Sequence, residues 1–441
     1  MIFQRSNELR RKAHDLIPGG CHTYAKGDDQ YPKQSPGFIV RGKGSHVWDV
    51  DGNEFIEYGQ GNRSVSLGHA FPEVIEAVQR QLVNGSNFTR PATIELDAAD
   101  ALLSMVPNSD MVKFCKDGSD ATTAALKLAR AYTGRNLIAC CRDQPFFATN
   151  DWFIGTTPLD AGIPNCVKAM TLTFRFNDLE SVKQLFLKHP NRIAGLIMEP
   201  AKYTDPEPGF LNAVRDLCHL HGALFIMDEM ITGFRWHNGG GQAYYGVDPD
   251  LSCWGKALGN GFSVSALTGK RKYMELGGLK HDSERVFLLS TTHGGETHGL
   301  AAAIATIGVY QREPVIETLY QRGQRLLTEG TQLIESHGLS KHIQIQGKPC
   351  CLVVSTLDRD GKPSQAMRSL FLQETIKRGI LMTSLVVSFS HSDQDIDRTL
   401  DAMDYALKVY REALENGVEN YLIGKPSKPV YRRYNFRSDS V

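Results

Sequence analysis

A short apolar segment that ends in two carboxylates constrains the fold of this chain most strongly. Residues 223–227 read Ala-Leu-Phe-Ile-Met and are followed directly by Asp228 and Glu229. A continuous apolar run of this length is typical of a strand that is buried on both faces of a parallel sheet. Lys256 follows further along the chain, between Gly255 and Ala257. An acid at a strand end and a lysine in an apolar neighbourhood are the groups that hold a pyridinium ring and form a Schiff base with its aldehyde.

Apolar runs alternate with helical periodicity from about residue 93 to residue 312. The clearest expected helices cover residues 120–133 and 209–221. This alternation predicts an α/β fold with a mainly parallel sheet between helices, and ligands bind such sheets at the carboxyl ends of the strands. The expected strands are residues 111–115, 136–141, 193–198, 223–227 and 264–268.

Both ends of the chain predict smaller elements. Asp51, Gly52 and Asn53 are typical of a hairpin turn. The basic tail at 421–441 is short of apolar residues, and we expect a solvent-facing arm. We expect one domain boundary after residue 60 and another after residue 312, which gives segments 1–60, 61–312 and 313–441. The expected elements are helices at 6–16, from residue 72, from about 313 and at 393–416, and strands at 37–41, 45–50, 54–58, 352–355 and 385–388.

The composition excludes several classes of protein. Lysine plus arginine and aspartate plus glutamate both number 49, so no overall basic field attracts nucleic acid or anionic lipid. A charged amino terminus and the lack of a long apolar run predict a cytoplasmic protein. The nine cysteines form no CxxC pair, and the fourteen histidines show no H-x₃-H pattern. We therefore expect no metal site and no disulfide framework.

A candidate phosphate site follows the expected strand at 111–115. Asp117, Gly118, Ser119 and Asp120 open the next expected helix. Glycine allows a close backbone approach, and the free amides and the serine hydroxyl at a helix start hold phosphate well. The alternative is that Asp117 or Ser119 only caps the helix, which is a common use of these residues.

With these features in order, the whole chain resembles the class III, fold-type I pyridoxal-phosphate enzymes of the glutamate-1-semialdehyde aminomutase and ω-aminotransferase group. The resemblance implies pyridoxal 5'-phosphate as cofactor, a large domain with a seven-stranded, mainly parallel sheet, and a smaller α+β domain built from both termini. The matching motifs are Pro-Gly-Gly at 18–20, Leu-Gly-His at 67–69, Lys-Asp-Gly-Ser-Asp-Ala at 116–121, Asp-Glu-Met-Ile-Thr-Gly-Phe-Arg at 228–235 and Gly-Lys-Ala-Leu-Gly at 255–259.

The resemblance also implies roles for individual residues. Lys256 would form the internal aldimine and move the substrate proton, and Asp228 would pair with the ring nitrogen and keep it protonated. Gly118 and Ser119 match the phosphate-binding turn. Phe146 matches a ring that stacks on the cofactor, although an ordinary core aromatic is the alternative.

Three further positions complete the implied cofactor site. Met230 would pack against the other face of the ring, and Glu199 matches a glutamate near the cofactor. Thr292 matches a hydroxyl that reaches the cofactor phosphate of the neighbouring subunit, with Thr291 as the alternative. This match predicts a homodimer with shared active sites.

Two departures from the aminomutase pattern favour ordinary transamination. The aminomutase has a substrate-contacting glutamate late in the chain, but residues 382–391 contain no carboxylate. Its mobile Ala-Gly-Ser gate is also absent from residues 150–157. We therefore expect an aminotransferase with a donor such as glutamate. The alternatives are glutamate-1-semialdehyde 2,1-aminomutase and, in another class, a non-catalytic pyridoxal-phosphate-binding regulatory protein.

Four residues are candidates for substrate binding. Thr23 and Lys26 align with a hydroxyl and a cation that hold a carboxylate in the aminomutase. Arg63 lies where the family has the pocket edge, and Arg235 ends the strand-turn motif. Any of the three cations is alternatively a surface or structural charge. The polar candidates predict a sugar-acid-like acceptor and a role in carbohydrate biosynthesis.

Overall fold

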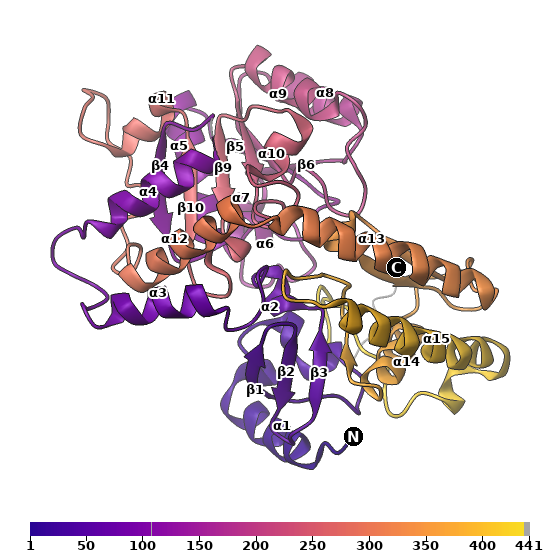
Figure 1. The fold of residues 1–441 in the computed structure, drawn as a ribbon. Coiled ribbons are helices and arrows are strands. Elements are labelled where there is room, and N and C mark those ends of the chain that lie inside the picture. The colour runs from indigo at the N-terminus through magenta and orange to yellow at the C-terminus, as the bar shows by residue number, and fades with distance from the viewer. Residues whose placement is uncertain (107, 436–441) are drawn as a thin grey trace. The chain divides into compact units, whose positions relative to one another are not determined.

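The computed structural model describes residues 1–106 and 108–435, which form two compact units (Figure 1). Unit 1 contains Met1–Asn62, Ser66–Phe71 and the residues from Glu317 onward. Unit 2 contains Arg63–Val65 and Pro72–Ile316. The return of Ser66–Phe71 to unit 1 is a detail that the predicted domain boundaries did not include.

Unit 2 is built on a seven-stranded sheet, which confirms the predicted α/β fold. Five neighbouring strands are parallel, and β10 is antiparallel to both of its neighbours. Strands β6 and β9 were not among the expected strands, because each has only four residues and includes serine or threonine. In spatial order the strands are β4 (Met111–Cys115), β10 (Ser265–Gly269), β9 (Leu251–Trp254), β8 (Leu224–Asp228), β7 (Ile193–Met198), β5 (Leu137–Cys141) and β6 (Thr171–Phe174).

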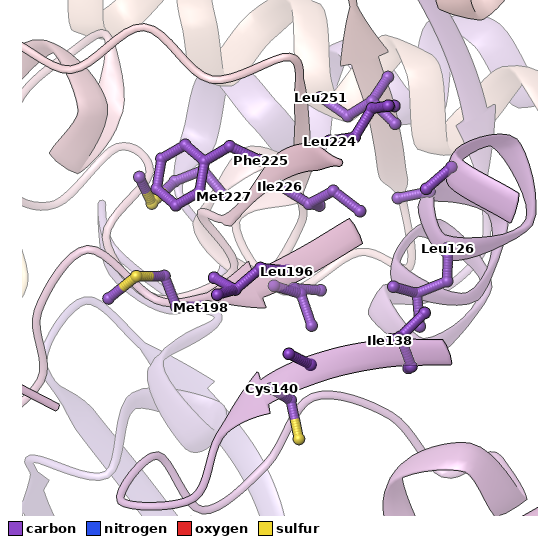
Figure 2. Packing of buried hydrophobic residues seen from close by; sticks show 14 of the residues in the cluster. Leu126, Ile138, Cys140, Leu196, Met198, Leu224, Phe225, Ile226, Met227 and Leu251 are labelled. Carbon is purple, nitrogen blue, oxygen red and sulfur yellow. The ribbon is translucent and has the colours of Figure 1, made fainter. Parts of the chain in front are cut away.

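The centre of this sheet is buried on both faces. Every residue of β7 and β8 is buried, as their continuous apolar sequences predict. Figure 2 shows the packed side chains of β5, β7 and β8 together with Leu126 of helix α5 (Gly118–Thr133). At Gly195 the helix approaches so closely that an added Cβ would lie 3.1 Å from the Ala129 Cβ.

Helices cover the sheet of unit 2. The most important for the site is α5, which begins at Gly118 because the Asp117 side chain accepts a hydrogen bond from the Asp120 N–H (3.0 Å). It ends at Gly134, which adopts a left-handed conformation. The helices are α3 (Pro72–Leu82), α4 (Ile94–Met105), α5 (Gly118–Thr133), α6 (Asp151–Ile154), α7 (Asn165–Lys168), α8 (Leu179–Lys188), α9 (Phe210–Leu220), α10 (Gly240–Tyr245), α11 (Arg271–Met274) and α12 (Thr297–Arg312).

Unit 1 joins the two ends of the chain through a sheet of order β1-β2-β3-β13. Asp49 forms the predicted hairpin turn, since its Oδ1 accepts hydrogen bonds from the N–H groups of Asp51 and Asn53. Strand β13 pairs in parallel with β3 and so brings late residues beside early ones. The elements are α1 (Gln4–Leu16), β1 (Ile39–Lys43), β2 (His46–Asp49), β3 (Glu54–Glu57), β11 (Ile343–Gln346), β12 (Val353–Thr356), α14 (Gln365–Ile376), β13 (Ile380–Leu381) and α15 (Asp393–Asn416).

Two elements contain points at which the chain passes from one unit to the other. Helix α13 covers Val315–Ser336. The short turn α2 covers Gln60–Arg63, where Gln60, Gly61, Asn62 and Arg63 all have positive φ angles of 44° to 71°. Consecutive left-handed non-glycine residues are strained, so the surrounding contacts must hold this turn in place.

Two expectations for the C-terminal part were wrong. Residues 385–388 form no strand, because Leu385 pairs with Leu352 while the Val386 N–H bonds to Tyr58, so no continuous ladder develops. The described part of the tail is not a free arm, since Arg432 forms a 2.6 Å ion pair with Asp29. The end of the predicted arm, residues 436–441, lies outside the described residues. In the described chain, no helix is both long enough and apolar enough to cross a membrane.

Candidate active site

Polar residues of unit 2 gather at one edge of the sheet. Asp228 is the last residue of β8, and Glu199 directly follows β7. Lys256 lies two residues after β9, and Gly118 lies three residues after β4. Strands β7, β8 and β9 are parallel, and β4 shares their direction because β10 is antiparallel to both β4 and β9. Their carboxyl ends therefore form one site.

Asp228 and Lys256 influence each other electrostatically. Asp228 is 2% exposed, and burial raises its pKa to about 7, with a further rise from Glu199 and an opposing effect of Lys256. Burial lowers the pKa of Lys256, and Asp228 opposes this effect. Asp228 accepts one hydrogen bond, at Oδ1 from the Met230 N–H (2.9 Å), and no other in the described chain. Its Oδ2 is therefore available to a bound molecule.

The backbone around Lys256 is tightly constrained. Lys256 has a φ of +47°, which is unusual for a residue with a side chain and typical of functional sites. A Cβ on Gly255 would lie 2.7 Å from the Met230 Sδ, and one on Gly118 would lie 2.8 Å from the same atom. Both glycines are thus needed for Met230 to lie between the lysine loop and the start of α5.

The start of α5 provides hydrogen-bond donors. The first amides of a helix have no hydrogen-bond partner within the helix. Among the amides of α5, the Asp117 side chain accepts a hydrogen bond from that of Asp120. The Ser119 Oγ accepts a hydrogen bond from the Thr149 N–H (3.0 Å). The amides of Gly118 and Ser119 therefore fit an anion such as phosphate. Asp117 serves as the helix cap, so the capping interpretation is correct for Asp117, while phosphate binding stays a prediction.

Glu199 is held firmly and is 2% exposed. Its backbone exchanges two 2.8 Å hydrogen bonds with the Gln144 side chain. Its Oε1 pairs with the Lys202 Nζ at 3.2 Å, whereas its Oε2 is buried without a hydrogen-bond partner in the described chain. A buried acceptor without a partner is costly and indicates a bound group or water.

Phe146 and Thr292 are exposed to solvent. Phe146 is 43% exposed and its ring meets that of Phe153 edge to face, while its neighbour Phe147 is 2% exposed in the core. The structure therefore argues against Phe146 as an ordinary core aromatic. Thr292 and Thr291 are both exposed, and the Thr292 carbonyl accepts a hydrogen bond from the Asn87 side chain (3.0 Å).

The four predicted substrate residues are not alike in the structure. Thr23 and Lys26 line a cavity of about 540 Å³ in unit 1, whereas Arg63 and Arg235 belong to unit 2. The positive charge of Arg63 lowers the pKa of Lys256, so Arg63 is near the lysine. Arg235 is fully buried, which favours its structural alternative.

Several contributors to the site were missed from the sequence. Gln144 and Thr149 are ordinary polar residues in a loop, and nothing in their spacing indicates their partners. Lys202 was also missed, because residues 199–202 are not helical and a spacing of three residues there does not by itself indicate the pair with Glu199. In the parts of the chain that the structure covers, no group of histidine, cysteine, aspartate and glutamate side chains is arranged to hold a metal ion.

The lysine, the buried acid and the amides at the helix start suit a phosphate-bearing aldehyde. Comparisons with known proteins identify the family. The family model for aminotransferase class-III matches residues 28–407, and this chain belongs to the class-III aminotransferase family.

Individual relatives match along nearly the full chain. Glutamate-1-semialdehyde 2,1-aminomutase of Desulforamulus reducens is 33% identical over 93% of this chain and 98% of its own. The 3-aminobutyryl-CoA aminotransferase of Cloacimonas acidaminovorans is 30% identical, with the same coverage of both chains. A solved structure, the PLP internal aldimine form of the FumI protein of Sphingopyxis sp. MTA144, has a TM-score of 0.86 at 28% identity over 93% of this chain and 98% of that one.

This protein is therefore an enzyme of the class-III family, whose cofactor is pyridoxal 5'-phosphate. The residues present fit that cofactor. The donors at Gly118 and Ser119 suit its phosphate, and the accessible Asp228 Oδ2 suits its ring nitrogen. The buried Glu199 Oε2 has no hydrogen-bond partner in the described chain and suits a polar group on the ring.

We expect the neighbouring carboxylates Asp228 and Glu229 to respond differently to neutralisation in the cofactor-free protein. The pKa of Asp228, about 7, lies above the value of about 3.9 for an unfolded aspartate, so ionisation of Asp228 destabilises the fold as pH rises through this range. Asp228→Asn should raise the free energy of unfolding at pH 8 by about 1–3 kcal/mol. The gain should disappear near pH 4.

Burial raises the pKa of Glu229 to about 7 as well, but Glu229→Gln should destabilise the protein at pH 8 by about 1–3 kcal/mol, because the loss of an accepted hydrogen bond outweighs the relief of a buried charge. Glu229 accepts hydrogen bonds from the Thr232 hydroxyl and from the N–H groups of Gly241 and Gln242. A glutamine amide would place a donor against one of these donors. Urea unfolding of both variants at pH 8 and pH 4 measures the difference. Lower stability of Asp228→Asn at pH 8 would contradict the expectation.

Proposed function

We propose that this enzyme transfers an amino group from glutamate to the carbonyl of a polar, sugar-acid-like acceptor, with Lys256 as the covalent attachment site of the cofactor. The observation that carries the proposal is the meeting of Lys256, Asp228 and the start of α5 at one sheet edge. The bound cofactor supplies an electron-accepting ring. Such a reaction belongs to carbohydrate biosynthesis.

The protein side chains have separate tasks in this reaction. The lowered pKa of Lys256 increases the fraction of neutral amine, which can take the proton from the carbon that carries the amino group. Asp228 holds a proton on the nitrogen that faces it. Met230 and Phe146 supply apolar surface that limits the position of a flat ring.

The cavity of unit 1 supports a polar acceptor. Its lining includes His14 and Asp28, which form a 3.1 Å hydrogen bond, together with Thr23, Lys26 and Asn62. A volume of about 540 Å³ suits a small molecule with several hydroxyl groups. Lys26 and Thr23 would bind its carboxylate, although a lysine cannot form the bidentate contact of an arginine.

The second candidate function is the intramolecular 2,1-aminomutase reaction. A relative of that name matches nearly the whole chain. The lack of a carboxylate in residues 382–391 weighs against it, and a relative named as an aminotransferase matches equally far. Conversion of glutamate 1-semialdehyde without an added amino donor would favour the aminomutase.

We expect Lys256→Ala to abolish the covalent cofactor adduct. The wild-type protein should bind pyridoxal 5'-phosphate with a visible absorbance band that decays when glutamate is added. Lys256→Ala should lose amine transfer by at least about 10³-fold, because attachment and proton transfer both require the amine. Lys183→Ala, at an exposed position of α8, is the control and should behave as wild type. An adduct on another lysine would refute the assigned role.

For the acceptor, we expect Lys26→Gln to raise KM for keto sugar acids by about tenfold, which corresponds to the loss of one charge-assisted contact of about 1.4 kcal/mol. The KM for neutral keto sugars should change little. Lys12→Gln, an exposed change on α1, is the control. Amine transfer from glutamate to a panel of sugar acids, keto sugars and short ω-aldehydes measures both effects. Preference for apolar acceptors would contradict the proposal.

We also propose a homodimer in which Thr292 of one chain completes the phosphate site of the other. The exposure of Thr292 supports this role, since its hydroxyl is accessible to a second chain. Lys256→Ala and Thr292→Val should both be weakly active, and mixing them under conditions of subunit exchange should restore up to about a quarter of wild-type activity, because random pairing gives one intact site in each mixed dimer. If activity does not recover although subunit exchange is proven, the sites are not shared. If Thr291 is the contributing residue, Thr291→Val should restore activity when mixed with Lys256→Ala.

A further inference from the structure

A second lysine lies in the cofactor site of unit 2. The Nζ of Lys202 is 3.2 Å from the Glu199 Oε1, and the side chains are 11% and 3% exposed. Lys202 also lies over the ring of Tyr203, with 5.8 Å between Nζ and the ring centroid. A buried pair of this kind differs from the exposed ion pairs of this protein, because neither charge is well solvated.

Glu199 cannot easily leave this pair. Its backbone is fixed by the two hydrogen bonds of Gln144, and Lys202 is the cation that it contacts. Without Lys202, the buried carboxylate would still act on two buried groups, Asp228 and Lys256, but would have lost its paired cation. The charge of Glu199 would then favour the protonated form of Lys256, and Arg63 would be left as the cation that opposes this effect.

We propose that Lys202 is the fixed counter-ion of Glu199 and thereby a positioning residue that keeps Lys256 free to lose its proton and Asp228 free to remain ionised. This inference rests on the proposed role of Lys256. Lys202 itself touches neither the cofactor nor the reacting carbon in the proposal.

The electrostatics of the site agree with this geometry. Glu199 raises the pKa of both Asp228 and Lys256, and Lys202 lowers the pKa of both. A cation 3.2 Å from the carboxylate therefore offsets the effect of Glu199 on each group. Arg63 also lowers the pKa of Lys256, so removal of Lys202 should weaken, and not abolish, the opposition to Glu199.

The test measures Lys256 in the cofactor-free protein. Competitive labelling with acetic anhydride across pH 6–10, followed by peptide mass spectrometry, gives the pH at which Lys256 is half protonated. Lys202→Met should raise this pH by about one unit, which is a roughly tenfold smaller neutral fraction near pH 7.5. The dissociation constant of pyridoxal 5'-phosphate at that pH should rise by a similar factor. Lys202→Arg should remain close to wild type.

Two further variants separate an electrostatic role from a purely structural one. Glu199→Gln should move the Lys256 midpoint in the opposite direction, to lower pH. The double variant Glu199→Gln with Lys202→Met should return it to near the wild-type value. If Lys202→Met does not fold, Glu199→Gln and the double variant still decide the question, and equal midpoints in these two proteins would overturn the proposal.

Lys183→Met provides the matched control. Lys183 pairs with Glu180 at the same i,i+3 spacing, but the pair is exposed and its closest atoms are 3.9 Å apart. No shift is expected there. An unchanged Lys256 midpoint in a folded Lys202→Met protein, with a change only in KM for the acceptor, would overturn the inference and make Lys202 a substrate-binding residue. If the wild-type adduct lies on another lysine, the proposed function fails instead.

Discussion

The convergence of parallel strand ends at one edge of a fully buried sheet is the constraint on which the site depends. Strands β7 and β8 contain no exposed position, so polar groups can enter only where the strands stop. Asp228 and Glu199 stand at these ends, in surroundings with little solvent. The same burial that stabilises the sheet therefore raises the pKa of Asp228 and lowers that of Lys256.

Balanced charge and close packing make this arrangement possible. Asp228 and Lys256 act on each other, and Glu199 has Lys202 as its direct partner. Met230 packs so closely that neither Gly118 nor Gly255 can carry a side chain without displacement. Strain is concentrated at the same place, since Lys256 has a positive φ. The contacts of the rigid sheet offset this cost.

Adjacent residues of similar chemistry have different tasks. Glu229 accepts three hydrogen bonds and fastens the loop after β8, whereas Asp228 accepts one and keeps an oxygen available.

Family membership does not by itself select the reaction, because relatives named for an aminomutase and for an aminotransferase both match over 93% of the chain. The residues that face the acceptor must select it. Thr23 and Lys26, in the cavity of unit 1, are the proposed pair.

The sequence alone determined the class of fold, because apolar runs such as residues 223–227 have few other uses. It indicated Asp228 through its place after such a run, and Lys256 through its apolar neighbourhood beside Gly255. The sequence did not predict the short strands β6 and β9, because their serine and threonine residues interrupt the apolar pattern, and it wrongly predicted a strand at 385–388. Only the tertiary structure showed that Arg235 is buried, that Phe146 is exposed and that Gln144 holds Glu199. Burial and hydrogen bonding between residues far apart in sequence depend on packing, which local patterns do not encode.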